Sequence, residues 1–328
     1  MLASSTSSAP ARPAALTELS SILPLLRELN DLKRGRVAGR AGSLAEQVFA
    51  GSWAALVAGE DLATVALRQT ARALTGVRLP GYDEPLLRSL GLSTEAAVHV
   101  QQQALRDAAQ PLDSALVAQL VPLVGTAELE TGQLPVFVAQ LAQQPRAGAT
   151  HPSRPRIMLS PPESHADHCA LVAVYAVVLS PYFGAEPGAA FLTGLAHHLH
   201  NAVLPDPGYA GDELLGTHLP GLMAAATQQA VQQLPMALQQ VVAAALERTR
   251  ALAEPASRAF HAADVLDRVL EMAWHDQNAQ FRLNQALGDL DIVHAGFTQQ
   301  FHQQVLAAAG LWSSNQATVK HTNSDSLH

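Results

Sequence analysis

Apolar residues along most of this chain recur at intervals of three and four positions, and this spacing constrains the fold more than any other feature. Leu26, Leu29 and Leu32 follow it in LLRELNDLKRGR, and segments such as SLAEQVFAGSWAALVAGE and ALVAQLVPLV continue it. This period places apolar side chains on one face of a helix. The alternation of apolar and polar residues that is typical of strands is missing. The sequence therefore predicts an all-α protein.

The composition is that of a soluble globular protein with a substantial buried core. The chain has 328 residues, of which 48% are hydrophobic and 15% are charged. Its formal net charge of −8 argues against general nucleic-acid binding, because such binding needs a broad basic surface. A small anionic ligand held by a local cluster remains compatible with that charge. Cys169 is the single cysteine, which excludes an intrachain disulfide and a Cys-rich zinc module.

Neither the N-terminus nor the longest apolar run indicates a membrane or a secretory route. The opening MLASSTSSAPARPAA is small and polar and lacks the apolar segment of a signal peptide. The run CALVAVYAVVL, from Cys169 to Leu179, is too short to cross a bilayer. We therefore expect a cytoplasmic protein with no membrane partner.

The proline-rich segment 145–162 is the best candidate for a boundary within the chain. It contains five prolines, which no continuous helix would carry. We expect a helical N-terminal region over 15–150 and a second helical domain over 151–311. Residues 1–14 and 312–328 are polar, and we expect them to be disordered. Directly after the boundary, Ser164-His165-Ala166-Asp167 has the pattern of a capping box that opens a helix.

Histidines gather in the segment GLAHHLHNAVLPD, from Gly194 to Asp206, at the end of a helix-like apolar run. A single histidine there would be explained as a polar cap on a buried helix. Three clustered histidines are more typical of a site that they share with other polar residues. Two such residues lie in the second half of the chain: His168, which begins an apolar helix, and Asp264, which lies within an apolar helical face. A buried carboxylate needs a cation, and a metal ion held by neighbouring imidazoles supplies one.

The order of these residues resembles the HD-domain superfamily, whose members are all-helical metal-dependent phosphohydrolases. GLAHHLH overlays the family pattern GLLHDIG, with His197 on the histidine of the HD doublet, and Asp264 matches the closing aspartate in an A-D-x-L-D context. The resemblance covers roughly His165 to Glu271. It implies an HD-like helical bundle with an additional helical N-terminal region, and a metal centre with these ligands: His168, His197, His198 and Asp264.

The doublet of this chain is His-His and not His-Asp, which changes the chemistry that the resemblance implies. A set of three histidines and one aspartate favours a borderline metal such as Fe, Mn, Zn, Co or Ni over Mg. Asn201 lies where some nucleotidase members of the superfamily carry a catalytic glutamate. We therefore expect proton transfer to be assisted by another residue, the candidates being His218, His200 and Glu213. An alternative register, with His200-Asn201 as the doublet, fits the preceding apolar residues less well.

Several further residues are candidates for contacts with a small phosphorylated ligand. The basic cluster comprises Lys33, Arg34, Arg36 and Arg40. It is either the solvent-exposed end of a helix, where cations complement the helix dipole, or a group of side chains that binds a phosphate or carboxylate next to the second half of the chain. His165 and Asn201 are further candidates for substrate binding. Asp267 and Arg268 are expected to form an ion pair on the outside of the helix that carries Asp264.

Three functions follow from these patterns. The preferred hypothesis is a metal-dependent hydrolase of phosphate esters, nucleotides among them. The first alternative is an iron oxygenase on the same scaffold, because some HD relatives activate oxygen. The second is a catalytically inactive HD-like module that binds a nucleotide or a partner protein, which the altered doublet favours.

Overall fold

The computed structural model describes residues 19–126, 134–278, 283, 287 and 292–312. Of the two segments that we expected to be disordered, residues 1–14 lie outside this part, as do all residues of 312–328 except Trp312. The described residues form helices and one short hairpin, so the prediction of an all-α fold is confirmed.

The N-terminal half contributes short and medium helices: α2 (Leu19–Asn30), α3 (Leu44–Val57), α4 (Leu62–Arg78), α5 (Glu84–Ser89), α6 (Thr94–Ala108), α7 (Ser114–Leu120) and α8 (Val136–Gln143). The second half contributes α9 (His165–Phe183), α10 (Pro187–Ala196), α11 (Gly208–Leu215), α12 (Leu219–Val231), α13 (Met236–Arg248), α14 (Pro255–Asn278) and α16 (Gln299–Ala308). Short 3-10 turns cover Asp31–Lys33 (η1), Val121–Leu123 (η2), Leu199–Ala202 (η3) and Gly216–His218 (η4).

Helix α9 is the centre of the molecule. The predicted capping box is confirmed: the Ser164 hydroxyl accepts from the Asp167 amide at 3.1 Å, and the Asp167 carboxylate accepts from the Ser164 amide at 3.2 Å. The helix ends at Gly184, whose φ of 63° is the left-handed conformation that terminates many helices. Among the described residues α9 alone is long and apolar enough to cross a membrane, yet 89% of its apolar window is buried inside the protein. Such burial is typical of the core helix of a globular protein.

The segment 145–162 forms a small antiparallel hairpin, of β1 (Ala149–His151) and β2 (Arg154–Ile157). The strands are too short to show the alternation that identifies a strand in a sequence. The hydrophobic core continues across this segment, because one cluster includes Leu26 and Trp53 from the N-terminal half together with Tyr175 and Leu266 from the second half.

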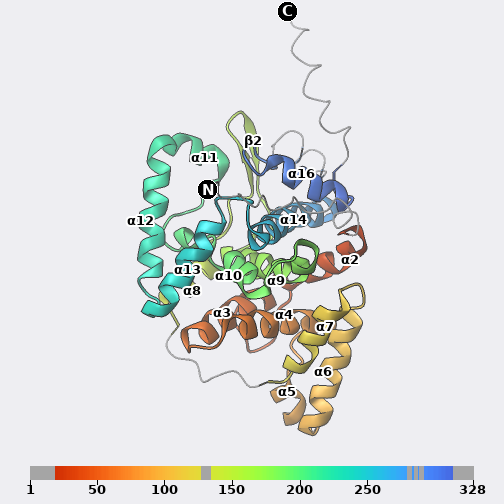
Figure 1. The fold of residues 1–328 in the computed structure, drawn as a ribbon. Helices are drawn as coiled ribbons and strands as arrows, with labels where there is room; N and C mark the ends of the chain where they lie inside the picture. The colour runs from red at the N-terminus through yellow and green to blue at the C-terminus, as the bar shows by residue number, and fades with distance from the viewer. Residues whose placement is uncertain (1–18, 127–133, 279–282, 284–286, 288–291, 313–328) are drawn as a thin grey trace, which may run out of the picture.

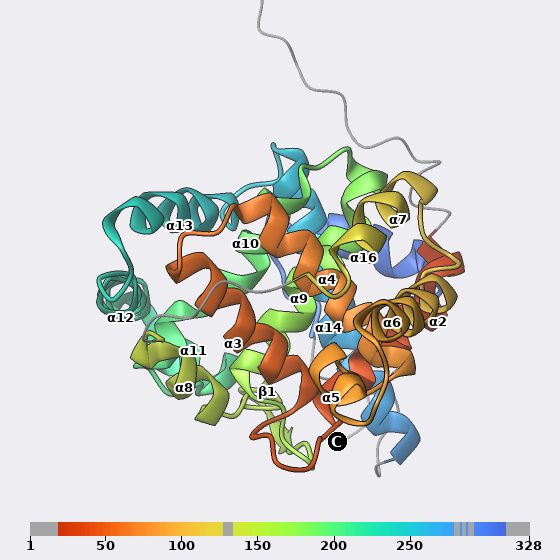
Figure 2. The same cartoon turned by 90° about the horizontal axis from the view of Figure 1, so that it is seen from below.

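Figure 1 shows α9 and α10 in the middle of the molecule, with α3 and α4 on one side and α14 on the other. The view from below agrees, with α9 and α14 lying behind α3 and α4 (Figure 2). Contacts of α9 with α10, α14, α3 and α4 account for this arrangement. The ends of α9 and α10 and one face of α14 therefore meet at one place, where the histidines and acidic residues lie.

Candidate metal centre

His168 lies in the first turn of α9 and is completely buried. Its Nδ1 atom is 2.6 Å from Oδ2 of Asp267, which comes from α14 and is also completely buried. A carboxylate only accepts hydrogen bonds, so Nδ1 carries the proton of the neutral ring. The Nε2 atom of His168 therefore presents a lone pair to the opposite side.

His197 caps the C-terminus of α10, and its Nδ1 atom is 2.7 Å from the carbonyl oxygen of Gly194. A carbonyl oxygen also only accepts, so the proton of a neutral His197 is again on Nδ1. Gly194 brings α10 close to α9: a Cβ atom at this position would lie 2.7 Å from the backbone nitrogen of Ala173. The close packing of the two helices thus sets the position of His197 relative to His168.

The Nε2 atoms of His168 and His197 face each other at 3.1 Å. In the neutral tautomers fixed by their Nδ1 partners, neither Nε2 carries a proton, so two lone pairs point at the same small space. This arrangement is unfavourable unless a cation, either a metal ion or a proton, lies between them. Imidazole nitrogens held in this way by a second hydrogen bond are the usual ligands of transition metals in proteins.

His198 and Asp264 complete the group. The side chain of Asn201 donates to the Leu204 carbonyl at 3.2 Å, so its Oδ1 atom, 2.8 Å from Nδ1 of His198, accepts from that nitrogen. One nitrogen each of His168, His197 and His198 lies within 4.8 Å of the others. Asp264 Oδ1 lies 3.4 Å from His168 Nε2 and 3.9 Å from His197 Nε2. The structure therefore brings together all four residues that we expected as ligands, and this donor set fits a transition metal ion.

A cavity of about 710 Å³ opens from this group. His197, His198 and Asp264 line it, as do two arginines, Arg146 and Arg268. Arg268 Nη2 lies 3.1 Å from Asp264 Oδ2, and Arg146 Nη1 lies 3.5 Å from His198 Nε2. Both guanidinium groups therefore border the candidate centre, where Arg268 contacts the carboxylate of Asp264 and Arg146 lies 3.7 Å from that of Glu163. Arg146 was not among the residues predicted from the sequence, because it lies in the proline-rich segment that we interpreted only as a boundary.

The candidates for proton transfer separate into two groups. His200 lines the cavity, while Glu213 and His218 are exposed on and after α11 and are not among the residues that line it. Asn201 lines the cavity and holds His198.

His165 is buried beside the candidate ligands. Its ring centroid lies 4.9 Å from that of His198, and its Nε2 lies 3.5 Å from Asp206 Oδ2. Neither of its nitrogens has a hydrogen bond in the described structure.

The basic cluster of the N-terminal half is largely engaged within the protein. The ammonium of Lys33 is buried against carboxylates, and Arg34 pairs with Glu271 and stacks on Trp274 with 3.8 Å between its Cζ atom and the ring centroid. Arg36 donates to the Lys33 carbonyl at 3.2 Å, and Arg40 pairs with Asp83.

The expectation that Asp267 pairs with Arg268 on the outside of its helix is wrong. Asp267 has no exposed surface and contacts Lys33 and His168, while Arg268 pairs with Asp264. The physical reason is helical spacing: Asp267 is three residues after Asp264, so both lie on the same face. Glu271 continues this face, and that spacing of three acidic residues is the signal that would have identified a buried acidic stripe.

Burial disfavours the charged form of four histidines of this region. It lowers the pKa of His197 to about 3 and that of His200 to about 4, and it also lowers the pKa of His165 and His198. His302, on α16, has a pKa lowered by burial to about 3. A neutral imidazole is the form that binds a metal ion.

We expect the metal-free protein to lose stability as the pH falls from 7.5 to 5.5. The unfolded chain takes up protons below about pH 6.5, whereas His197, His200 and His302 stay neutral in the folded protein, so protonation favours unfolding. Each of them contributes a loss of roughly 1 kcal/mol at pH 5.5. Burial raises the pKa of Asp167 to about 7, so this carboxyl takes up a proton in the folded protein and offsets part of the loss. Urea denaturation at the two pH values measures the difference. Replacing the exposed His99 with Gln should leave it unchanged, whereas equal stability at both pH values would contradict the prediction.

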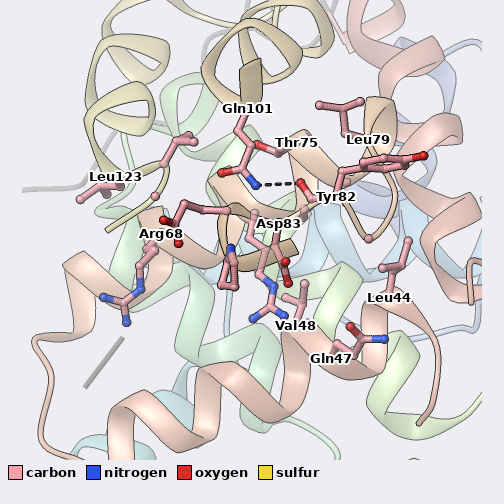
Figure 3. Close-up of a pocket in the computed structure, with 18 of the residues that line it drawn as sticks. Leu44, Gln47, Val48, Arg68, Thr75, Leu79, Tyr82, Asp83, Gln101 and Leu123 are labelled. Carbon is pink, nitrogen blue, oxygen red and sulfur yellow. Dashed lines mark hydrogen bonds between the residues drawn. The ribbon is translucent and has the colours of Figure 1, made fainter. Parts of the chain in front are cut away.

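A second cavity, of about 550 Å³, lies among α3, α4 and α6 and shares no lining residue with the first (Figure 3). The Gln101 side chain donates to the Tyr82 carbonyl at 2.8 Å across it. Its buried guanidinium, that of Arg68, already pairs with Glu60 at 2.5 Å. None of the described residues that line this second cavity is a histidine, so we place the candidate metal centre in the first cavity.

Comparison of the chain with protein-family models, with curated proteins and with solved structures finds no match in any of the three.

Proposed function

We propose that this protein is a metal-dependent hydrolase of phosphate esters with an HD-like centre. The single observation that carries the proposal is the convergence of His168 Nε2, His197 Nε2 and Asp264 Oδ1 at the wall of a cavity that two arginines border. Lone pairs and a carboxylate attract a cation, and the guanidinium groups attract an anion. A cation and an anion held side by side are what the hydrolysis of a phosphate ester requires.

The ligands of the metal ion would be His168, His197, His198 and Asp264. When bound, such an ion lowers the pKa of a water molecule and polarises a phosphoryl oxygen. Asp267 and the Gly194 carbonyl orient two of the imidazoles, and Asn201 orients the third. The chain therefore holds each of the three rings by its Nδ1 atom.

Arg146 and Arg268 would bind the phosphate group, because a guanidinium offers paired donors that match its oxygens. His200, which lines the cavity and is kept neutral by burial, is the candidate that can accept a proton there. The outer wall of the cavity is apolar and comes from α11 and α12, with Leu215, Leu219, Leu222 and Met223. It leaves room for the organic part of the ester.

We expect the purified protein to contain close to one transition metal ion per chain, and a His197→Ala/Asp264→Ala variant to contain almost none. The variant loses one imidazole and the carboxylate, which leaves too few ligands for tight binding. Elemental mass spectrometry after reconstitution with Fe, Mn, Zn, Co or Ni measures the content. His218→Ala is the matched control, because this exposed histidine lies outside the cavity lining and its loss should leave the metal content unchanged.

The same preparations test the reaction. A panel of p-nitrophenyl phosphate, bis(p-nitrophenyl) phosphate and nucleoside phosphates should show metal-stimulated hydrolysis that the double variant loses. Turnover that survives the double substitution would contradict the assignment of the centre. Stoichiometric metal without hydrolysis of any ester, but with oxygen uptake by the iron form, would contradict the hydrolase and favour the oxygenase.

A further inference from the structure

Lys33 ends the 3-10 turn η1 and extends its side chain into the second half of the protein, where it is almost completely buried. Its Nζ atom lies 2.5 Å from Glu163 Oε1, 2.9 Å from Asp267 Oδ2 and 3.4 Å from Glu271 Oε2. All three carboxylates are themselves buried. We call Glu163, Asp267 and Glu271 the carboxylate cage.

The carboxylate cage lies directly behind the candidate metal centre. Asp267 Oδ2 contacts both the ammonium and His168 Nδ1, and His168 Nδ1 is also 3.9 Å from Glu163 Oε1. The cage is thus separated from the Nε2 side of the centre by the width of one imidazole ring.

Donor atoms of Glu163, His168 and Asp267 lie within 4.8 Å of one another, the spacing that a metal ion needs. Carboxylate oxygens are the ligands that Mn²⁺, Mg²⁺ and Ca²⁺ prefer. The Lys33 ammonium lies among these same oxygens. A cation therefore already occupies the place where a second metal ion would bind.

We propose that the carboxylate cage is a second cation site, filled by the Lys33 ammonium, which limits the neighbouring His/Asp centre to one metal ion. The metal count at that centre rests on the proposed function, whereas the cage and its occupant do not. Without the Lys33 ammonium, the three buried carboxylates would keep only two arginine contacts. Arg34 pairs with Glu271, and Arg146 lies 3.7 Å from Glu163. Among the described residues, Asp267 would then have no lysine or arginine within ion-pair distance.

The proposal also gives the N-terminal region a role. Lys33 is a positioning residue: it fixes Asp267, which in turn fixes the tautomer of His168. A covalently attached ammonium cannot dissociate, so Asp267 stays available to His168 at any metal concentration. A free divalent ion in the cage would instead compete with His168 for that carboxylate.

The test is the number of Mn²⁺ ions bound per chain, measured by equilibrium dialysis for four proteins. The wild type is expected to bind one ion, and Lys33→Ala is expected to bind two. Lys33→Arg, which keeps the charge, should bind one. Lys33→Ala/Glu271→Gln, which removes a carboxylate of the cage, should return to one. Propylammonium should compete with the second ion in Lys33→Ala, because it restores an ammonium on a short apolar chain.

The outcomes separate this inference from the proposed function. One ion in both the wild type and Lys33→Ala overturns the inference and leaves the metal centre intact. No ion in the wild type and one in Lys33→Ala overturns the metal centre and supports the cage. If Lys33→Ala does not fold alone, Mn²⁺ or propylammonium should restore its circular dichroism and cooperative melting, and failure of both to do so overturns the inference.

Discussion

Replacing Asp267 with asparagine should lower the free energy of unfolding by about 3–5 kcal/mol, the usual cost of breaking a buried ion pair by removing one partner. The change keeps the shape of the side chain and removes the charge that faces both Lys33 and His168. The ammonium would keep only Glu163 and Glu271. Urea denaturation of the metal-free protein measures this loss.

The same substitution should weaken metal binding 10- to 100-fold, the range found when a residue that orients a metal ligand is removed. An asparagine can place its amide NH₂ group opposite His168 Nδ1, which favours the other tautomer of the ring. Titration with Zn²⁺ against a chelating dye measures the affinity. Asp107→Asn is the control: Asp107 pairs with Arg78 on the surface, with 57% of its side chain exposed, and its loss should cost less than about 1 kcal/mol. Equal effects of the two substitutions would contradict the prediction.

Gly194→Ala is the second substitution with a large expected effect. The added methyl group would lie 2.7 Å from the nitrogen and 2.8 Å from the Cα atom of Ala173, which belong to the backbone of α9 and cannot rotate away. The helices must separate, at a cost of roughly 1–3 kcal/mol. His197 follows Gly194 by three residues, so the separation also moves its Nε2 atom away from His168. We therefore expect a lower melting temperature together with weaker metal binding.

Gly221→Ala provides the matched control for this prediction. Gly221 lies in α12, is exposed, and has no atom within 4 Å of an added Cβ. Alanine should stabilise the helix there by about 0.5–1 kcal/mol and leave the metal affinity unchanged. A Gly194→Ala protein that binds metal as tightly as the wild type would show that the position of His197 does not depend on the approach of α10 to α9.

The sequence predicted those features that depend on neighbouring residues. The spacing of apolar residues indicated the helices, and Ser164 and Asp167 identified the start of α9 because a capping box spans only four positions. The grouping of His168 with His197 and Asp264 was also expected, but on the basis of a resemblance and not of periodicity.

Contacts between distant segments were not predicted. Lys33 and Asp267 are separated by 234 positions, and nothing in the pattern around either residue indicates the other. Periodicity shows which face of a helix is buried, but not which helix covers it. Arg146 was missed for a related reason: it precedes a hairpin whose position is fixed by packing and not by a helical repeat. A lone lysine among the arginines of the basic cluster was the one local sign that Lys33 differs from its neighbours.

The continuity of the core, together with the origin of Lys33, has a consequence for the modularity of the chain. A fragment that begins at residue 151 would retain every candidate metal ligand, yet it would carry Glu163, Asp267 and Glu271 without the lysine that neutralises them. It would also expose the faces of α9 that α3 and α4 cover. The candidate metal ligands of the second half therefore depend on the helices of the first half. Neither part could be moved to another protein or replaced without redesigning the other.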